Sequence, residues 1–552
     1  MSNNFRSNAE IIVKANVTGE IFECKEGLSF WGGVDPSTGC IVDVHHINNG
    51  NSLVGKLVLM PTSRGSCSGS GVLLQLMQNG LAPKALIFHE EEEILTLGAI
   101  VSDQLFNKKV AILRVSKDIY SDLATEDTAE IFENTLVCGS KTIKLWGLDT
   151  ETLYLNSTDR SMLNGDQGIA NKIAMEAICK MAVVQSANEL IDVTKGHIDG
   201  CILAHDANLI FAEKMYKLGA NVSIPTTINA ISVNLNNWEN QGVEPDFGNK
   251  ASRLANAYEK MGAHPTYTCA PYLLENKPQR DEVIGWSESN AVIYANSILG
   301  AKTQKHPDYL DLFIAMTGRA PKAGVYLTEN RIPKIEISVH LPTDFDDSIW
   351  PMLGWLIGDL SPNKIPLVTG LEMTSPSDDN LKALCAAFGT TSAAPMLHIN
   401  GHTPGKVYSI PSKLKNFNIT KNHLAKLWNK FNYADLRVDL VAIGSPHASL
   451  TECQSFVKFF NGKNCNPNVK TIITIGRDIL SKAKSEGLVE QLTSAGVQII
   501  SDICWCSITE PILPPEASVI MTNSGKYAHY AHGLTGRKTR FGSLKDLSLI
   551  HI

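Results

Sequence analysis

Short apolar runs separated by Gly and Pro turns dominate residues 10–115. The segments IIVKANVTGEIFEC, GCIVDVHHI and GKLVLMP alternate apolar with polar positions and are rich in β-branched residues, which predicts strands. GSGVLLQLMQNGLAP has the pattern of a helix that ends near Gly80 and Pro83. KALIFHE and VAILRV predict buried strands. We therefore expect a compact α/β unit over residues 1–115.

The pattern changes after this unit. Residues 116–155 are polar and charged, and they predict a linker with some local structure. From residue 156 onward, helical segments such as GIANKIAMEAICKMAVVQSA alternate with short apolar runs such as VDLVAIG. This alternation implies largely parallel sheets that bind ligands at the carboxyl ends of their strands. The predicted fold class is α/β, with an N-terminal β/α domain joined to a large, multi-lobed α/β domain over residues 156–552.

Composition narrows the class of protein. The 552 residues are 43% hydrophobic, enough for a large core, and the formal net charge is −7. A negative chain whose positive charges are scattered disfavours nucleic-acid binding. Because no uncharged apolar run reaches the length of a membrane span and the N-terminus lacks a secretory pattern, the expected compartment is the cytoplasm, without membrane partners. Free thiols, rather than disulfides, are expected there for the twelve cysteines.

Six short strands lead directly into polar loops that contain Gly, Pro or Ser. They are NVSIPTTINA, PTYTCAPY, GWSESNAVIYANS, LVAIGSPHAS, IISDICWC and IMTNSGKYAHY. Loops at strand ends collect the functional groups of α/β proteins, so six converging loops would form a polar pocket. Turn chemistry alone would explain any single one of them, since the same residue types dominate turns.

The N-terminal region offers one further loop, PTSRGSCSGSG. Its small residues permit close backbone approach, and its exposed amides could form an anion nest. Arg64 could hold a carboxylate through two parallel hydrogen bonds, and Ser66 could transfer a proton. The loop is not a P-loop, because no Gly-Lys-Ser/Thr follows. A flexible surface loop is the alternative.

Charged and thiol side chains in the larger region carry further chemistry. Glu288 is either an acid–base group or a salt-bridge partner at a helix start. Lys526 would serve as a base if a closed apolar cleft lowered its pKa, and would otherwise be an ordinary surface lysine. Cys269 and Cys504 each lie where a strand meets a loop. They are either small buried hydrophobes or ligands of a soft metal such as an iron–sulfur cluster.

Several long motifs resemble the aconitase X family. LSFWGGVDPSTG, RGSCSGS and NGLAPKALIF are similar to its small swivelling domain. Similar to its large catalytic domain are LNGDQGIANKIAMEAI, ELIDVTKGHIDGC, PTTINAISV, TCAPY, WSESNAVIYANSILGAKT, MTGRAP, HINGHTP, GSPHASL and TNSGKYAHY. The motifs follow the family's order and span nearly the whole chain.

The resemblance implies a hydro-lyase with a swivelling domain fused to a catalytic domain. Known members dehydrate cis-3-hydroxy-L-proline or mevalonate 5-phosphate. The fused form is more similar to the hydroxyproline branch, whose product becomes Δ1-pyrroline-2-carboxylate. Such a dehydration needs a base, assistance for the departing hydroxide and positive groups around the carboxylate. By resemblance, the catalytic residues are Ser66, Lys526 and Glu288, and substrate is bound by Arg64, Gly65, Thr226, Thr227, Asn229, Tyr272, Ser289, Asn290, His447 and Ser524.

The family pattern also implies an iron–sulfur cluster, and here the sequence departs from it. Cys269 and Cys504 occupy two of the expected ligand positions. The third ligand is expected either at a position occupied by Ser445 or at one occupied by Leu547. Cys506 is the alternative third metal ligand.

These departures leave three interpretations open. The first is a dehydratase of a small hydroxy acid. The second is a cluster-free relative, an isomerase or lyase of a biosynthetic pathway, and the third is a non-catalytic binding protein. The family's Ala-Arg-Thr is also Ala-Lys302-Thr here, and lysine does not reproduce the bidentate carboxylate contact of arginine. The chain is expected to be a monomer or a small homo-oligomer.

Overall fold

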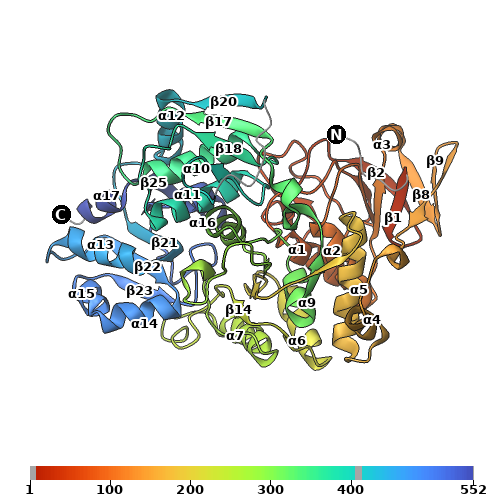
Figure 1. The fold of residues 1–552 in the computed structure, drawn as a ribbon, viewed down its shortest axis with the longest axis horizontal. Helices are drawn as coiled ribbons and strands as arrows, with labels where there is room; N and C mark the ends of the chain where they lie inside the picture. Colours follow the sequence, from red (N-terminus) through yellow and green to blue (C-terminus); the bar gives the residue numbers. More distant parts are fainter. Residues whose placement is uncertain (1–7, 405–412, 551–552) are drawn as a thin grey trace.

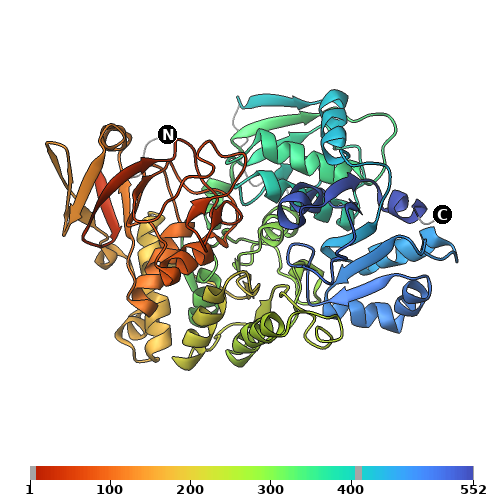
Figure 2. The ribbon, with the colours of Figure 1, turned by 180° about the vertical axis from the view of Figure 1, so that it is seen from behind.

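The computed structural model describes residues 8–404 and 413–550, and they form four lobes in chain order. We call them the N-terminal lobe (8–147), the central lobe (157–321), the upper lobe (335–431) and the C-terminal lobe (440–549). Figure 1 shows the N-terminal lobe in red and orange at one end of the molecule and the blue C-terminal lobe at the other, with the central lobe between them. The view from behind in Figure 2 shows the same order.

The N-terminal lobe is built on a nine-stranded sheet with the order β10-β9-β8-β2-β5-β6-β7-β1-β11. Its strands are β1 (Ala9–Val13), β2 (Val17–Glu23), β5 (Leu57–Leu59), β6 (Ala85–Phe88), β7 (Ala111–Val115), β8 (Thr128–Phe132), β9 (Thr135–Cys138), β10 (Lys141–Lys144) and β11 (Trp146–Gly147). A small hairpin pairs β3 (Val34–Asp35) with β4 (Cys40–Ile41). The lobe also contains the helices α1 (Gly69–Asn79), α2 (Ile94–Phe106) and α3 (Lys117–Leu123).

Two helical crossovers connect the parallel strands β5, β6 and β7. The first is α1, which ends at Gly80, in the left-handed conformation with φ 71° that glycine adopts readily. The second is α2, packed so closely that a Cβ at Gly98 would lie 2.7 Å from the Ser70 carbonyl oxygen. Strands β6 and β7 are wholly buried, as their largely apolar sequences predicted, and the one charged side chain, Arg114 of β7, pairs with Glu10. The crossovers place the loop before α1 at the carboxyl end of β5.

The segment 116–155, expected to be a linker with local structure, contributes α3 and strands β8, β9, β10 and β11. These strands extend the first sheet, because β8 pairs with β2 and β11 pairs with β1. The side chains along β8 alternate between exposed and buried, so one face of this hairpin is exposed to solvent, which explains why its sequence is polar.

The central lobe carries two small sheets among helices. Three parallel strands, β13 (Gly196–Ile198), β14 (Thr226–Ile228) and β15 (Gly285–Trp286), have the order β14-β13-β15, and β12 (Leu190–Asp192) pairs with β16 (Arg319–Pro321). The helices are α4 (Ser157–Asn164), α5 (Ile169–Val184), α6 (Asp206–Lys217), α7 (Pro245–Lys260), α8 (Ser289–Tyr294) and α9 (Leu310–Thr317).

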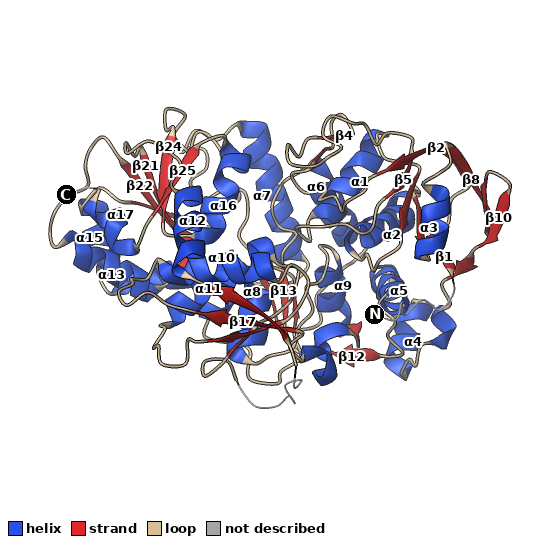
Figure 3. Ribbon diagram, turned by 90° about the horizontal axis from the view of Figure 1, so that it is seen from above, coloured by secondary structure: helices blue, strands red, loops and turns tan. Residues whose placement is uncertain are grey.

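The two remaining lobes each contain one wholly parallel sheet flanked by helices (Figure 3). The upper lobe consists of β17 (Ile335–Val339), α10 (Ile349–Leu360), β18 (Pro366–Thr369), α11 (Asp378–Thr391), β19 (His398–Ile399), β20 (Lys415–Ile419) and α12 (Lys421–Phe431). The C-terminal lobe consists of β21 (Leu440–Ala448), α13 (Leu450–Phe460), β22 (Lys470–Ile475), α14 (Arg477–Ser485), α15 (Leu488–Ser494), β23 (Gln498–Ser501), β24 (Val519–Thr522), α16 (Gly525–Thr535), β25 (Lys538–Phe541) and α17 (Leu544–Leu549). The predicted α/β class with largely parallel sheets is confirmed.

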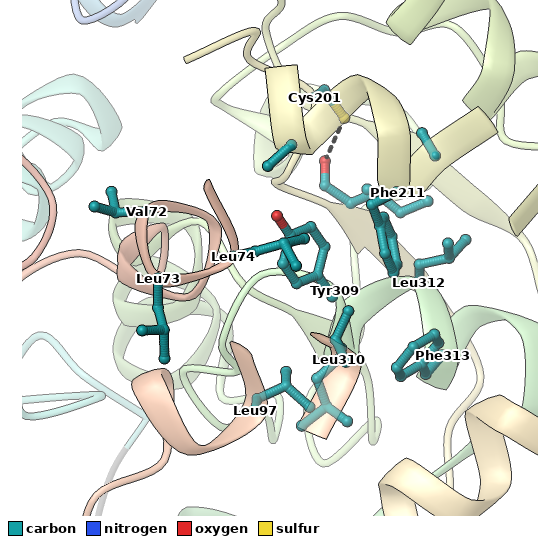
Figure 4. Packing of buried hydrophobic residues seen from close by; sticks show 14 of the residues in the cluster. Val72, Leu73, Leu74, Leu97, Cys201, Phe211, Tyr309, Leu310, Leu312 and Phe313 are labelled. Carbon is teal, nitrogen blue, oxygen red and sulfur yellow. Dashed lines mark hydrogen bonds between the residues drawn. The ribbon is translucent and has the colours of Figure 1, made fainter. Parts of the chain in front are cut away.

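One apolar core joins the N-terminal and central lobes. Side chains of α1, α2, α6 and α9 belong to a single buried cluster. Figure 4 shows Leu74 of α1 beside Tyr309, which in turn faces Phe211 of α6, and the two rings lie 4.1 Å apart between centroids. This packing brings the loop before α1 against the central lobe. In the part of the chain that the structure describes, no helix is long and apolar enough to cross a membrane.

Candidate active site

The loop before α1 touches the central lobe through a buried group of one thiol and two carboxylates. The Cys67 thiol donates to Asp199 Oδ2 at 3.0 Å, and Asp199 directly follows strand β13. Asp308, just before α9, completes a set whose potential ligand atoms all lie within 4.8 Å of one another. Burial and the neighbouring charges of Glu288 and Asp308 raise the pKa of Asp199, and burial raises the pKa of Asp308 to about 6.

Hydrogen bonds lead from this acid–thiol group to a buried ion pair. The Asn229 amide donates to Asp199 Oδ1 and, at 3.3 Å, to Glu288 Oε2. Lys526 Nζ, at the start of α16, lies 2.9 Å from Glu288 Oε1. Asn290 also donates to Glu288 Oε1, at 2.5 Å. Residues from the central and C-terminal lobes therefore meet beside the loop of the N-terminal lobe.

The two members of the ion pair hold one another in the charged form. Burial would raise the pKa of Glu288, but the Lys526 ammonium and the Lys526 and Asn290 hydrogen bonds outweigh it, so the pKa lies below its usual value. Burial would lower the pKa of Lys526, but Glu288 and the nearby thiols raise it well above its usual value. Lys526 is therefore a charged ammonium in the free protein, so the condition under which it would act as a base, a lowered pKa, is not met.

Three thiols form a row beside this ion pair. Cys269, Cys504 and Cys506 pack with Ala230, and Cys504 hydrogen-bonds to both of the other thiols. Those two hydrogen bonds lower the pKa of Cys504 well below its usual value, whereas the pKa values of its two partners are raised. The His447 amide donates to Cys269 Sγ at 3.3 Å. A buried thiolate flanked by two thiols is a donor set for a soft metal centre.

The two other positions considered for a third thiol ligand hold no such donor. The Ser445 carbonyl accepts a hydrogen bond from the Ser524 hydroxyl. Leu547 is fully buried among apolar side chains of the C-terminal lobe. Lys302, which stands where the family has an arginine, forms an ion pair with Asp281 at 3.6 Å. Cys506 is thus the thiol that the tertiary structure brings beside Cys504.

The predicted residues of the N-terminal loop differ in burial and in the partners they contact. Ser66 is partly buried next to Cys67, with its hydroxyl 3.3 Å from Ser68 Oγ. Gly65 is exposed, with φ 89°. Arg64 is exposed and pairs with Glu26 at 3.1 Å, so its guanidinium is directed to its own lobe. The structure brings Ser66, and not the Arg64 guanidinium, to the acid–thiol group.

Two predicted substrate-binding residues lie at a separate cavity. Thr226 and Thr227 on β14 line a cavity of about 520 Å³, together with Lys195, His264 and Trp286. The Thr227 hydroxyl also lies 2.7 Å from His197 Nδ1. The acid–thiol group does not line this cavity.

The remaining predicted residues support the ion pair and the thiols. Tyr272 donates to Asn290 Oδ1 at 2.8 Å, and Asn290 also donates to the Cys269 carbonyl. The buried His447 ring lies 2.8 Å from the Ile503 carbonyl oxygen. Ser524 caps α16 by accepting from the Tyr527 amide, and Ser289 is the first residue of α8.

The sequence analysis missed Cys67, Asp199, Asp308 and Lys305. Lys305 is partly buried, and its charge acts on Cys67, Glu288 and Asp199. Asp199 had a detectable signal, because it ends the buried strand in KGHIDG and so occupies a ligand-binding position of a parallel sheet. The other three lie in loops whose partners are remote in sequence.

This fold and site define a multi-lobed α/β protein with acid–base and thiol groups where the N-terminal, central and C-terminal lobes meet. The chain belongs to the aconitase X family. Family models match the aconitase X swivel domain over residues 6–138, the first domain over 152–329, the second over 333–429 and the third over 438–549.

Two relatives match across nearly the whole chain, and two more distant ones match about 70% of it. The cis-3-hydroxy-L-proline dehydratase of Hypocrea jecorina is 41% identical, covering 96% of this chain and 93% of the relative. The cis-3-hydroxy-L-proline dehydratase of Pseudomonas aeruginosa is 40% identical, covering 97% of this chain and 94% of the relative. A more distant relative, the phosphomevalonate dehydratase large subunit of Methanothermobacter thermautotrophicus, is 29% identical over 70% of this chain and 95% of its own. The crystal structure of Thermococcus kodakaraensis aconitase X in its holo form has a TM-score of 0.66 at 29% identity, covering 72% of this chain and 99% of that one.

Proposed function

We propose that this chain dehydrates cis-3-hydroxy-L-proline. The chain is a hydro-lyase, and the observation that carries the substrate is its similarity to two cis-3-hydroxy-L-proline dehydratases over nearly its whole length and theirs. The phosphomevalonate dehydratase subunit is a more distant relative, so mevalonate 5-phosphate is the less favoured substrate. Removal of the proton on Cα and of the hydroxide on the neighbouring carbon forms a carbon–carbon double bond, and the unsaturated product tautomerises to Δ1-pyrroline-2-carboxylate.

Ser66 is the proposed proton acceptor. Lys526 and Glu288 are proposed to lie on the other side of the bound substrate. The contact of Cys67 with Asp199 supports this assignment, since it holds the adjacent Ser66 at the central lobe. Lys526 is an ammonium, so it favours negative charge on the substrate as the proton leaves. Glu288 fixes the position of that ammonium at 2.9 Å.

Substrate contacts by the other predicted residues are part of the proposal. Asn229 and Asn290 are the best supported, because both bind Glu288 directly. Arg64 would need to leave Glu26 to reach a carboxylate. Contacts by Gly65, Thr226, Thr227, Tyr272, Ser289, His447 and Ser524, the cytoplasmic location and the state as monomer or small homo-oligomer stay predictions.

Cys269, Cys504 and Cys506 would hold the iron–sulfur cluster that the family implies. Their fit rests on the low pKa of Cys504 and on the thiol–thiol contacts, because metals bind the thiolate form. When bound, such a centre supplies a Lewis acid for the departing hydroxyl group. Lys526, whose charge also favours the Cys504 thiolate, would stabilise the negative charge of that centre.

Turnover by purified protein tests the function directly. Protein purified without oxygen is incubated with cis-3-hydroxy-L-proline, and Δ1-pyrroline-2-carboxylate is measured by its adduct with o-aminobenzaldehyde. We expect turnover that falls at least about 100-fold in Ser66→Ala, with no change in Ser121→Ala, an exposed hydroxyl in α3. Equal rates for Ser66→Ala and the parent would exclude Ser66 as the base. Turnover of mevalonate 5-phosphate but not of the imino acid would overturn the substrate.

Iron and sulfide analysis tests the metal centre. We expect iron, acid-labile sulfide and visible absorption in the parent protein and their loss in Cys506→Ser. Cys465→Ser is the matched control, since Cys465 is a partly buried thiol remote from this row. Turnover by a protein free of iron would favour the cluster-free interpretation, and a folded protein that binds L-proline without turning over any hydroxy acid would favour the binding protein.

A further inference from the structure

The acid–thiol group holds more acidic side chains than there are cationic side chains nearby to pair with them. Asp199 and Asp308 are 8% and 2% exposed. Asp311 is also buried, and its Oδ2 accepts a hydrogen bond from the Asp199 backbone amide at 2.7 Å. Lys526 is already paired with Glu288, which leaves Lys305 as the basic side chain whose charge acts on Cys67. Burying several carboxyl groups without cationic partners is costly, so this arrangement is typical of a site that receives a cation.

One oxygen of the group also lacks a partner. Asp308 Oδ1 is buried and accepts no hydrogen bond from any described residue. The hydroxyl of Ser287, whose carbonyl oxygen lies 3.9 Å from Cys67 Sγ, is likewise buried without a partner. Buried polar atoms are almost always paired in native proteins, so two unpaired atoms on residues that contact or neighbour Cys67 indicate a bound polar group.

We propose that Asp199 and Asp308 bind the positively charged ring nitrogen of the substrate. The inference rests on the proposed function, because the ring nitrogen of a hydroxyproline is a secondary ammonium at neutral pH. That ammonium has two N–H donors, and the two carboxylates offer one acceptor each. Their charge–charge hydrogen bonds would be strong in a site from which water is excluded.

This position is consistent with the chemistry proposed for Ser66. The carbon that loses its proton is bonded directly to the ring nitrogen. Cys67, the neighbour of Ser66 in the chain, touches Asp199. An ammonium held by the two aspartates therefore places Cα beside the N-terminal loop. The next ring atom is the carbon that bears the hydroxyl group. That hydroxyl group can face Lys526 and the thiols, because Asn229 connects Asp199 to Glu288, the partner of Lys526.

The same residues suit an organic ammonium better than a divalent metal ion. The Cys67 thiol donates to Asp199, and burial and the Asp308 and Asp199 charges raise its pKa, so a metal would have to displace its proton. Lys305 adds a positive charge whose repulsion is twice as large for a divalent ion as for an ammonium. The Asn229 amide already donates to Asp199 Oδ1.

A pair of ligands that differ only in the ring atom tests the inference. L-Proline carries the ammonium, whereas (S)-tetrahydrofuran-2-carboxylate has the same ring and carboxylate but an ether oxygen. Calorimetry on the complete protein, in the state in which it turns over hydroxyproline, should show L-proline binding at least about 30-fold more tightly. Asp199→Asn and Asp308→Asn should remove most of this preference and leave the affinity for the ether acid within about threefold. Asp246→Asn, an exposed acid on α7, is the matched control and should change neither affinity.

Several outcomes would overturn the inference without affecting the proposed function. Equal affinity of the parent protein for the two ligands is one, and it needs no variant to fold. Equal weakening of both ligands in Asp199→Asn is another, since it would indicate a structural role. Binding of Mn²⁺ by the parent that is lost in Asp199→Asn, with no preference for L-proline, would assign the group to a metal. Absence of hydroxyproline turnover in the parent protein would instead contradict the proposed function itself.

Discussion

At the scale of single residues, the site depends on how each buried charge is balanced. Glu288 and Lys526 are both removed from water, yet each stays ionised because the other lies 2.9 Å away. Cys504 has a low pKa for a related reason, since two thiols donate to it and Lys526 is nearby. These three groups form one electrostatic unit, so a change in one alters the others.

Replacing Lys526 with methionine tests this unit. The change removes the ammonium that holds the pKa of Glu288 low, so that pKa rises and Glu288 becomes protonated at higher pH. We expect kcat/KM to fall about 100-fold or more, and the acid limb of its pH profile to move to higher pH. Lys526→Arg keeps the charge and should keep the acid limb near its original position. A methionine variant with an unshifted acid limb would show that the pair does not control Glu288.

At the scale of elements, a buried arginine joins α4 to the β12–β16 sheet. Arg319 on β16 donates to Asp159 of α4 at 2.8 Å, and also binds Asp192 and the Leu190 carbonyl of β12. Asp159 is fully buried. Deleting one partner of a buried pair leaves the other charge without compensation, which costs more than deleting an exposed pair.

Arg319→Met should lower the free energy of unfolding by about 3–5 kcal/mol. Arg253→Met, which removes an exposed ion pair with Glu213, should cost less than about 1 kcal/mol. Urea unfolding followed by tryptophan fluorescence measures both. Similar losses in the two variants would mean that the Arg319 pair is no stronger than a surface contact.

At the scale of the whole molecule, the junction of the N-terminal and central lobes includes a titratable contact. Glu93, at the start of α2, accepts a hydrogen bond from Gln185 at the end of α5, at 2.6 Å. Burial raises the pKa of Glu93 to about 7. The folded chain therefore binds a proton that the unfolded chain has lost at intermediate pH, so this group makes the protein less stable as pH rises from about 4.5 to 7.

Glu93→Gln removes that dependence while keeping an acceptor for Gln185. We expect the variant to match the parent at pH 5 and to unfold at a higher temperature at pH 7.5. The parent should lose up to about 1.4 kcal/mol of unfolding free energy per pH unit through this group. Thermal unfolding at both pH values measures this, with Glu91→Gln as the exposed control. A difference between variant and parent that is the same at both pH values would exclude titration of Glu93 as the cause.

The sequence by itself determined the local elements and the family. The apolar runs of β6 and β7, the helix that ends at Gly80 and the alternation of strands and helices all depend on neighbours within a few residues, so they are visible in the chain. The motifs also singled out Ser66, Glu288, Lys526 and the three thiols as candidates, whose roles stay predictions. The polar strands β8 to β11 were less visible, because their place in the first sheet depends on pairing with the distant β1 and β2.

Only the tertiary structure decided which groups share the site. Cys67 and Asp199 are 132 residues apart, and no local pattern records that they meet. Cys506 became the third thiol, Arg64 was turned to Glu26, and Thr226 was placed at another cavity. Periodicity fixes which face of an element is buried, whereas the charges around a group, and therefore its pKa, are set by the packing of whole lobes.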